Sequence, residues 1–556
     1  MSPAGRAAVT LALLLGAAAT VVIPAIGGGS PSTIGVPAAA PTSTPTIDDQ
    51  APISAAQGAP DRPWGPTAPE WSRALADARS LSVEDAAGLV IVPRWNSPDA
   101  SAAAALMERG GFGGMILMRG AIQDAGQVAR LTSTISAAAD HPWGTLVSVD
   151  QEGGTVARLA GLVPDLPGFM AAGAARDPAE VEPLYAQAAV DMRAMGFTVD
   201  YAPVADMTIG PSDPTIRTRS AGDDVDDVSA TVIAAVDGYL EGGVVPVIKH
   251  FPGHGSVTVD SHAALPVQRA SLEALGTRDL VPFQRAIDAG APALMMGHIS
   301  VPAWGPGPAT LEPAAYAHAR EAMGFDGLIF TDALDMGAIT DSHAPGDAAV
   351  DALAAGADVL LMPPDPMAAR AAIVAAVESG ALERERLDEA AARLIALQRW
   401  QRGLGPFADT GENYGRALAV AGATVAARDC DAPLVEAPVL VTGGRAIERE
   451  RLASALVARG IGASADAEVA DGSTPSPSPS AATTVHLTSS RSVADGADVL
   501  VALGGPWVLE GRSAEAYVAV YGRSDDALAG LADVLAGAAP GGDWPVAVDV
   551  PHSVCS

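Results

Sequence analysis

The residues best suited to chemistry are concentrated in the stretch VIKHFPGHGSVTVDSH, residues 247–262. A short apolar segment is followed there by a lysine, three histidines and an acid, namely Lys249, His250, His254, Asp260 and His262. Such groups in one loop can bind a metal ion, transfer a proton or cradle an anion. Other features of the sequence are needed to distinguish between these three kinds of chemistry.

The spacing of His250 and His254 addresses the metal hypothesis. Histidines four residues apart share one face of a helix, as in the zinc-binding HExxH motif. Pro252, Gly253 and Gly255 are incompatible with a helix here, and the glutamate of that motif is missing. We therefore predict no metal, and we interpret His254 as a residue that holds the loop by hydrogen bonds.

The acid and the last histidine of the stretch favour proton transfer. Asp260 and His262 flank a single serine. A carboxylate beside an imidazole fixes its tautomer and raises its pKa, which gives a group that can donate and accept a proton near neutral pH. The bent loop would carry this pair to the mouth of the site.

The elements that must position these residues form a repeating pattern. Short apolar runs alternate with Ala-rich amphipathic stretches, and the eight runs are residues 89–92, 115–118, 146–149, 198–201, 244–248, 293–296, 328–330 and 359–362. Predicted helices between them include residues 181–195, 225–241, 271–289 and 313–323. The pattern predicts a (β/α)₈ barrel, with a doubly wound sheet as the runner-up fold.

Polar side chains follow five of these eight runs. They are Asp150, Asp206, Lys249 with His250, His298 and Asp332. Catalytic residues of (β/α)₈ barrels come from the carboxyl ends of the strands. We therefore expect these groups to converge on one rim, although short polar residues also end strands for purely structural reasons.

A smaller α/β domain is predicted after the barrel. We expect a barrel over residues 70–404 that ends in a helix at 382–402, then a connector over 405–432, and the second domain over 433–556. The predicted strands of that domain are residues 439–442, 484–487, 499–503, 518–521 and 546–550, and its helices include 447–459 and 525–535. Residues 473–480, STPSPSPS, look like a surface loop. No glycine pattern there binds phosphate, so we assign no cofactor.

The N-terminal segment predicts export. Residues 1–29 carry Arg6, an apolar run and a glycine-rich end, as in a signal peptide, and the run is also long enough for a membrane anchor. Residues 30–69 are rich in Pro, Ala, Ser and Thr and are expected to form a disordered tether. The only cysteines are Cys430 and Cys555, and their spacing leaves open whether they pair.

The net charge of the chain indicates which classes of molecule it is unsuited to bind. Acidic residues outnumber basic ones 65 to 33, for a net charge of -32. Nucleic-acid binding requires clustered Lys and Arg, so we expect no nucleic-acid partner. A membrane tether through the N-terminal segment remains open, and we expect a secreted or cell-envelope monomer.

Three motifs carry a resemblance to a known family. The segments KHFPGHGSVTVDSH at residues 249–262, VDQEGGTVARL at 149–159 and FDGLIFTDALDM at 325–336 together resemble the β-N-acetylglucosaminidases of family 3 glycoside hydrolases. The resemblance covers residues 89–402, and AYVAVYGR at 516–523 is similar to part of the family's second domain. It implies a barrel enzyme that acts on a carbohydrate.

The resemblance also implies catalytic roles. Asp332 corresponds to the nucleophile that forms a covalent glycosyl-enzyme intermediate, and His262, oriented by Asp260, to the acid/base. Helix capping is the plain structural alternative for Asp332. Asp335, three residues further on, would lie beside or below the sugar.

Further matches imply sugar-binding residues. These are Asp150, Arg158, Lys249 and His250, together with Arg219 in IRTRSAG and His298, whose role stays open. Around Arg219 the family pattern IGxRSFG is altered, because Arg217 and Ala221 replace its Gly and Phe. Arg158 could instead only neutralise Asp150 or Glu152.

The resulting hypothesis is an exo-acting, retaining β-N-acetylglucosaminidase for terminal N-acetylglucosamine of cell-wall or related glycans. A β-glucosidase is disfavoured, because such enzymes of the superfamily usually take their acid/base from the second domain. A phosphorylase stays open, since a histidine tolerates incoming phosphate better than a carboxylate does. A non-catalytic wall-binding protein is the alternative from another class, but aromatic residues are only 4% of the chain.

Overall fold

The computed structural model describes residues 64–139, 141–405, 407–466, 483–489 and 496–555. The predicted signal or anchor at 1–29, most of the predicted tether and the STPSPSPS loop lie outside these residues. Within the described ranges, none of the helices has the length and apolar character needed to span a bilayer.

Short parallel strands organise the larger part of the chain. They are β1 (Ile91–Val92), β2 (Arg94–Trp95), β3 (Gly114–Leu117), β4 (Leu146–Val149), β7 (Val199–Asp200), β8 (Val245–Pro246), β9 (Ile248–Phe251), β10 (Ala293–Met296), β11 (Leu328–Thr331) and β12 (Leu360–Leu361). Parallel pairing runs from β2 through β3, β4 and β7 to β8, and from β9 through β10 to β11.

Isolated contacts join these two sheets into a circuit. Parallel bridges link Val204 to Lys249 and Phe330 to Val359, and β12 pairs with β1. A single residue, Pro93, separates β1 from β2, and a single residue, Val247, separates β8 from β9. Each of these pairs therefore acts as one interrupted strand, and the carboxyl ends of all strands lie on the same side of the circuit.

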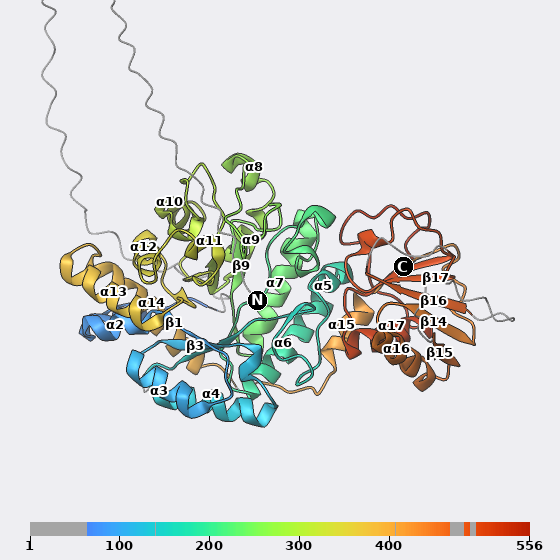
Figure 1. Cartoon of the computed structure of the whole chain (residues 1–556), viewed down its shortest axis with the longest axis horizontal. Helices are drawn as coiled ribbons and strands as arrows, with labels where there is room; N and C mark the ends of the chain where they lie inside the picture. Colours follow the sequence, from blue (N-terminus) through green and yellow to red (C-terminus); the bar gives the residue numbers. More distant parts are fainter. Residues whose placement is uncertain (1–63, 140, 406, 467–482, 490–495, 556) are drawn as a thin grey trace, which may run out of the picture. The chain divides into compact units, whose positions relative to one another are not determined.

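Helices alternate with these strands (Figure 1). They are α1 (Ala68–Ser80), α2 (Val83–Leu89), α3 (Ala100–Gly110), α4 (Ala125–Ala139), α5 (Met170–Ala175), α6 (Pro178–Ala194), α7 (Val225–Glu241), α8 (Leu272–Gly276), α9 (Val281–Ala289), α10 (Pro313–Ala317), α11 (Gly337–Thr340), α12 (Asp347–Ala355), α13 (Pro366–Ser379) and α14 (Arg384–Arg402). Several have side-chain caps: Asp224 accepts hydrogen bonds from two backbone amides at the start of α7. Gly290, at φ 101°, ends α9.

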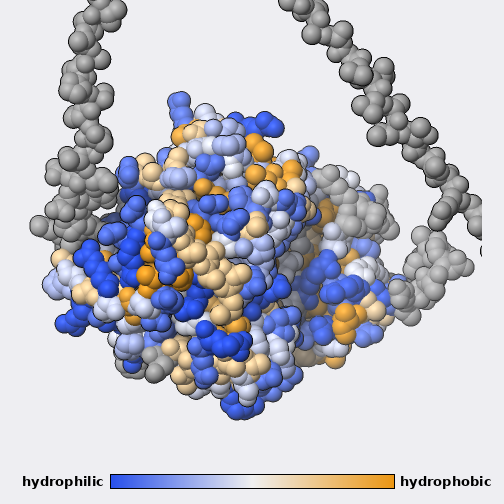
Figure 2. Space-filling view, turned by 60° about the vertical axis from the view of Figure 1, so that its left-hand side comes forward, coloured by the Kyte–Doolittle hydropathy of each residue, from blue (hydrophilic) through white to orange (hydrophobic). Residues whose placement is uncertain are grey.

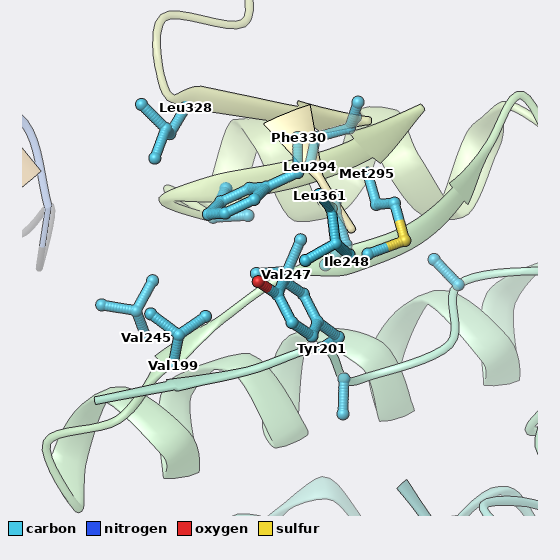
Figure 3. Close-up of a cluster of buried hydrophobic side chains, with 14 of the residues drawn as sticks. Val199, Tyr201, Val245, Val247, Ile248, Leu294, Met295, Leu328, Phe330 and Leu361 are labelled. Atoms are coloured by element: carbon cyan, nitrogen blue, oxygen red, sulfur yellow. The ribbon is translucent and has the colours of Figure 1, made fainter. Parts of the chain in front are cut away.

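The strands enclose an apolar core. Figure 3 shows side chains from β7, β8, β9, β10, β11 and β12 meeting one another, and all of the labelled residues are buried. The rings of Tyr201 and Phe330 pack edge to face with centroids 5.5 Å apart. At the surface, polar and apolar residues are interspersed on the face shown in Figure 2. The packing of the buried side chains therefore fixes the positions of the strand ends that carry the polar groups.

A second sheet forms the C-terminal part. Its six strands lie in the order β13 (Thr424–Ala427), β18 (Ala516–Ala519), β17 (Val499–Ala502), β16 (Thr483–Thr488), β14 (Val439–Gly443) and β15 (Ala463–Ala465). All pairs are parallel except β13 with β18. Its helices are α15 (Tyr414–Ala421), α16 (Ala446–Ala458) and α17 (Asp525–Leu535). The prediction of a two-domain α/β chain is confirmed.

Several predicted boundaries need correction. The stretch 405–432 is more than a connector, because it contains α15 and the edge strand β13. Residues 546–550 form no strand: the chain end contributes only bridges, such as Ala426 with Val554. The predicted helix 271–289 is split into α8 and α9, and the second half of 313–323 is a π-helical turn.

Two further contacts involve residues near the chain ends. The last part of the predicted tether is folded, because Trp64 is buried against Trp400 of α14 with ring centroids 5.4 Å apart. Cys430 and Cys555 form a disulfide that ties the chain end to the residues following β13. The pairing question that the spacing left open is thereby answered.

Candidate active site

The predicted site residues come together at the carboxyl ends of the strands. Asp150 follows β4, Lys249 and His250 belong to β9, His298 follows β10, and Asp332 follows β11. Arg219 ends the 3₁₀ turn η3 (Arg217–Arg219), in the long segment between β7 and α7. His262 and Asp260 lie in the loop that follows β9.

Four charged side chains form a balanced group that we call the charge cluster: Asp150, Glu152, Arg219 and Lys249. The Lys249 ammonium lies 2.5 Å from Glu152 Oε1 and 3.1 Å from Asp150 Oδ1. Arg219 donates two hydrogen bonds to Glu152, of 2.7 Å from Nε and 2.9 Å from Nη2. The side chains of Lys249 and Glu152 are each only 3% exposed, so the cluster is an internal ion network.

The electrostatics of the charge cluster keep it ionised. Burial alone would raise the pKa of Glu152, but Arg219 and Lys249 hold that pKa well below its usual range. Burial alone would lower the pKa of Lys249, whereas Glu152 and Asp150 raise it. Asp150 is the most exposed acid of the cluster, at 20%, and can therefore meet a ligand.

A tight hairpin, β5 (Gln151–Gly153) with β6 (Val156–Ala157), positions both acids of the cluster. The Gln151 amide donates to Asp200 Oδ1 at 2.8 Å, and the Gln151 side chain accepts from the Leu159 amide at 2.8 Å. The turn requires Gly154, which has φ 56°, because a Cβ there would lie 2.8 Å from the Gly168 Cα. Arg158 reaches only to 3.9 Å from Asp150 Oδ2.

Asp206 organises the start of the histidine loop. Its Oδ2 lies 2.7 Å from His250 Nδ1, and its Oδ1 accepts hydrogen bonds from the backbone amides of His250 and His254 at 3.1 and 2.6 Å. His250 Nε2 lies 3.3 Å from Arg219 Nη2, an obligate donor. His250 therefore connects Asp206 to the charge cluster.

The acid/base pair predicted from the sequence has the required contact. His262 Nδ1 lies 2.8 Å from Asp260 Oδ1, and the same oxygen accepts the His262 backbone amide at 3.0 Å. Partial burial would raise the pKa of Asp260, but its bonds to His262 lower it. The His262 side chain is 65% exposed, so its Nε2 faces outward and is available to a ligand.

The loop around His262 packs against the segment that follows Asp332. The Ala338 amide of α11 donates to the Ser261 carbonyl oxygen at 3.3 Å. A Cβ at Gly337 would lie 2.9 Å from the His262 carbonyl oxygen, so a glycine allows this close approach. The acid/base loop and the chain after the predicted nucleophile are therefore neighbours.

Asp332 is held as a buried carboxylate. Its Oδ1 accepts the Ala333 amide at 2.7 Å, and its own amide donates to the Met296 carbonyl at 2.9 Å. Burial would raise the pKa of Asp332, but His298 and His250 lower it to about 2, with help from the Ala333 hydrogen bond. Asp335 instead pairs with Arg94 at 3.0 Å.

His298 has a defined position next to the backbone that follows Asp332. Its Nε2 lies 2.9 Å from the Ala333 carbonyl oxygen and its Nδ1 lies 2.7 Å from the Thr310 hydroxyl oxygen. The side chain is fully buried, and burial lowers its pKa. His298 therefore fixes the backbone next to Asp332. The sequence leaves the role of His298 open, and this contact gives it a structural role.

Sequence reasoning missed the parts played by Glu152 and Asp206. The sequence suggests for Glu152 only a charge that Arg158 could neutralise, whereas its partners in the structure are Arg219 and Lys249. The position of Asp206 after an apolar run predicts its place on the rim, but nothing in the sequence indicates that it binds His250 and the His254 amide. Among the residues that the structure describes, no set of three His, Cys, Asp or Glu side chains is arranged to hold a metal ion.

Comparisons with known proteins agree on one family. The model described as "Glycosyl hydrolase family 3 N terminal domain" matches residues 83–397. β-Hexosaminidase LpqI of Mycobacterium tuberculosis is 34% identical over 367 residues, which make up 63% of this chain and 87% of that protein. β-Hexosaminidase A of Pseudoalteromonas piscicida is 31% identical over 326 residues, 53% of this chain and 54% of the other, so this match spans about half of that relative.

A solved structure extends the similarity beyond the family model. A glycoside hydrolase family 3 β-N-acetylglucosaminidase from Paenibacillus sp. matches with a TM-score of 0.73 at 27% sequence identity. The match covers 85% of this chain and 100% of the other. The likeness therefore includes both α/β parts of the chain.

Proposed function

The chain belongs to glycosyl hydrolase family 3 and is a glycoside hydrolase of the β-hexosaminidase type, and we propose that it is an exo-acting, retaining β-N-acetylglucosaminidase. The observation that carries this proposal is that two unlike groups lie on neighbouring segments of the site. One is Asp332, a carboxylate with its pKa lowered to about 2. The other is His262, whose Nδ1 is bound by Asp260 while its Nε2 faces outward.

In the first step, Asp332 attacks the anomeric carbon and displaces the aglycone. His262 Nε2 donates a proton to the departing glycosidic oxygen, and the Asp260 carboxylate stabilises the imidazolium before transfer. The bond from the anomeric carbon to the glycosidic oxygen breaks as the bond to Asp332 forms. Protonation of the leaving oxygen lowers the barrier because an alkoxide is a poor leaving group.

In the second step, water hydrolyses the glycosyl ester of Asp332. His262, now neutral, accepts a proton from that water as it attacks the anomeric carbon. Two displacements at one carbon give net retention of the β configuration. A histidine in this role leaves one negative charge fewer near the ester than a second carboxylate would.

The charge cluster is the proposed sugar-binding surface. Asp150 is partly exposed and accepts a sugar hydroxyl, while Arg219 and Lys249 donate from their remaining N–H groups. Glu152 pairs with both cations and thereby balances their charge. Arg158 and His250 complete the surface in this proposal, and the buried His298 supports the backbone next to Asp332.

The wider context of the activity is also part of the proposal. In this proposal the circuit of parallel strands forms a (β/α)₈ barrel, and the site lies at its carboxyl rim, where the active sites of such barrels are found. The substrates are cell-wall-derived glycans with a terminal β-linked N-acetylglucosamine, and the enzyme acts after export, as the predicted N-terminal signal implies.

Hydrolysis of a panel of 4-nitrophenyl glycosides tests this proposal. We expect turnover of the β-N-acetylglucosaminide, little of the β-glucoside, and release of the β-anomer as the first product by NMR. Efficient turnover of the glucoside would favour a glucosidase, and first release of the α-anomer would contradict retention. Absence of turnover on all substrates would favour a wall-binding protein.

Phosphorolysis is the second candidate, because the proposed base is a histidine whose exposed Nε2 does not repel an incoming phosphate. Assays with and without inorganic phosphate, with detection of the sugar 1-phosphate, separate the two reactions. Hydrolysis predicts the same rate in both and no sugar 1-phosphate. A phosphate-dependent rate with stoichiometric sugar 1-phosphate would reverse the assignment.

A further inference from the structure

A cavity of about 320 Å³ lies at the amino ends of the parallel strands. Two of the residues that line it, Thr145 and Thr198, directly precede β4 and β7. The candidate catalytic residues follow the carboxyl ends of the strands, so the cavity and the candidate active site lie on opposite sides of the circuit. Its volume is in the range of small-molecule sites. The cavity is therefore a feature separate from the proposed sugar-binding surface.

The last turns of α14 form one wall of this cavity, and hydrogen bonds hold that wall in place. Gln398 Nε2 donates to the carbonyl oxygen of Gly113, just before β3, at 3.0 Å. Gln401 Nε2 donates to the carbonyl oxygen of Thr198. Both glutamine side chains are buried. Because these bonds reach the starts of two strands, the wall is already arranged before any ligand binds.

One buried polar atom of this wall lacks a partner. Gln398 is 2% exposed, and its Oε1 accepts no hydrogen bond from the residues that the structure describes. The orientation of the amide is fixed, because the Gly113 carbonyl can only accept and Nε2 must therefore face it. A buried acceptor without a donor costs free energy. A ligand hydroxyl in the cavity would supply the missing donor.

Two arginines give the cavity a positive lining. Arg193 is half-buried over the Phe407 ring, with its guanidinium carbon 5.9 Å from the ring centroid. Burial lowers the pKa of Arg193, and no acid of the described ranges offsets this effect. Arg402 donates to the Pro142 carbonyl oxygen at 2.6 Å and keeps further N–H groups for a ligand.

The cavity contrasts with the rest of the chain in its charge. Acidic residues outnumber basic ones 65 to 33 in the sequence, yet none of the described residues that line the cavity is acidic. The arginines of the charge cluster and of the helix surfaces mostly face carboxylates, as Arg219 faces Glu152. A polar cavity with two guanidinium groups and no acid of its own suits an anion.

We propose that this cavity binds a small polyhydroxylated anion, whose charged group is bound by Arg193 and Arg402 and whose hydroxyl donates to Gln398. This inference goes beyond the proposed glycosidase activity and does not depend on it. A guanidinium matches a carboxylate or a phosphate through paired hydrogen bonds. Hydroxylated carboxylates and sugar phosphates share this chemistry, and the experiment separates them.

Isothermal titration calorimetry of the full chain at constant ionic strength tests the inference. The probes are D-gluconate and D-glucose 6-phosphate. D-Glucose controls for hydroxyl groups without charge, whereas acetate and sulfate control for charge without several hydroxyl groups. We expect at least one of the two hydroxylated anions to bind with a Kd at least roughly tenfold below those of the three controls, because both kinds of contact are then made. Tighter binding of gluconate would identify the carboxylate, and tighter binding of glucose 6-phosphate the phosphate.

Two variants locate the bound anion. Arg193→Gln and Arg402→Gln should each raise the Kd roughly tenfold, as for loss of a hydrogen bond to a charged group. Arg109→Gln, on the exposed surface of α3, removes the same charge elsewhere and should leave the Kd unchanged. Circular dichroism checks the fold, and Arg402 is exposed, so its variant serves even if that of Arg193 does not fold.

Three results would overturn the inference. The first is that neither hydroxylated anion binds. The second is that glucose, acetate or sulfate binds as tightly as the better of the two anions, because the cavity would then not require charge and hydroxyl groups together. The third is a wild-type Kd in either folded arginine variant, which would place the anion elsewhere, for example at the charge cluster.

Discussion

His254 Nε2 lies 2.8 Å from the Ser261 hydroxyl oxygen, and this contact joins the two halves of the histidine loop. The His254 amide, just after β9, donates a hydrogen bond to Asp206. Ser261 lies between Asp260 and His262 in the sequence. Both side chains are buried. The contact thus anchors the otherwise exposed pair of Asp260 and His262, the proposed acid/base, to the rim of the strands.

Ser261→Ala should therefore lower kcat more than it raises KM. Loss of one buried hydrogen bond costs about 1 kcal/mol, and the freed loop would present His262 less often in the productive position. Steady-state kinetics should give a kcat reduced roughly tenfold, while Ser342→Ala, beyond α11, should behave like the wild type. A change in KM alone would indicate that the loop binds substrate and does not position the acid.

His262→Gln should reduce kcat/KM by about 10² to 10⁴ on substrates with poor leaving groups. The loss should be smaller with 2,4-dinitrophenolate, which leaves without protonation. Asp260→Asn should follow the same trend with a smaller effect, since it keeps the imidazole but removes its charge partner.

The control for this series is His343→Gln, a histidine after α11 whose Nδ1 lies 2.9 Å from the Ser342 hydroxyl oxygen. It should retain wild-type activity. An equal loss with both leaving groups in the His262 variant would mean that His262 does not protonate the aglycone.

Glu152→Gln should destabilise the fold and weaken substrate binding. The substitution leaves Arg219 and Lys249 buried with one negative partner fewer, and breaking such a buried pair typically costs roughly 3–5 kcal/mol. Urea unfolding measures this loss. Glu515→Gln, in an exposed pair with Arg428, should cost less than about 1 kcal/mol. Equal small effects would show that the network contributes little to stability.

The carboxylate of Asp332 should make stability depend on pH in strongly acidic solution. Its folded-state pKa, about 2, is below the ordinary value of 3.8, so its contribution is present above pH 3.8 and is lost as pH falls through about 2. The shift corresponds to about 2 kcal/mol. In urea unfolding between pH 4 and pH 2.5, Asp332→Asn should show a weaker decline than the wild type. Parallel declines would contradict the lowered pKa.

Local sequence signals predicted the regular elements well. Helices α7 and α17 match the predicted ranges 225–241 and 525–535, because Asp224 and Ser524 cap them and their apolar faces are strongly periodic. The failures came from tertiary effects. Strand β13 is short and Ala-rich, and it is a strand because residues distant in the sequence, above all those of β18, pair with it. The helix predicted over 271–289 breaks between Gly276, which ends α8, and Val281, which begins α9.

Site residues could be predicted to interact where they lie close together in the sequence. Asp260 and His262 interact across one intervening residue, so their motif predicts their contact. Glu152 meets Arg219 67 residues away, and Asp206 meets His250 44 residues away. No local pattern specifies such pairs, because they depend on how the strands are ordered around the circuit.

The most direct test of the account is the identity of the residue that becomes glycosylated. Incubation with a fluorinated N-acetylglucosaminyl fluoride, which forms the glycosyl-enzyme rapidly and hydrolyses slowly, should trap the intermediate for peptide mass spectrometry. We predict one added sugar on the peptide containing residues 325–336, with fragmentation placing it on Asp332. An adduct on Asp335 or on another residue, or time-dependent inactivation with no adduct on any peptide, would contradict the proposed mechanism.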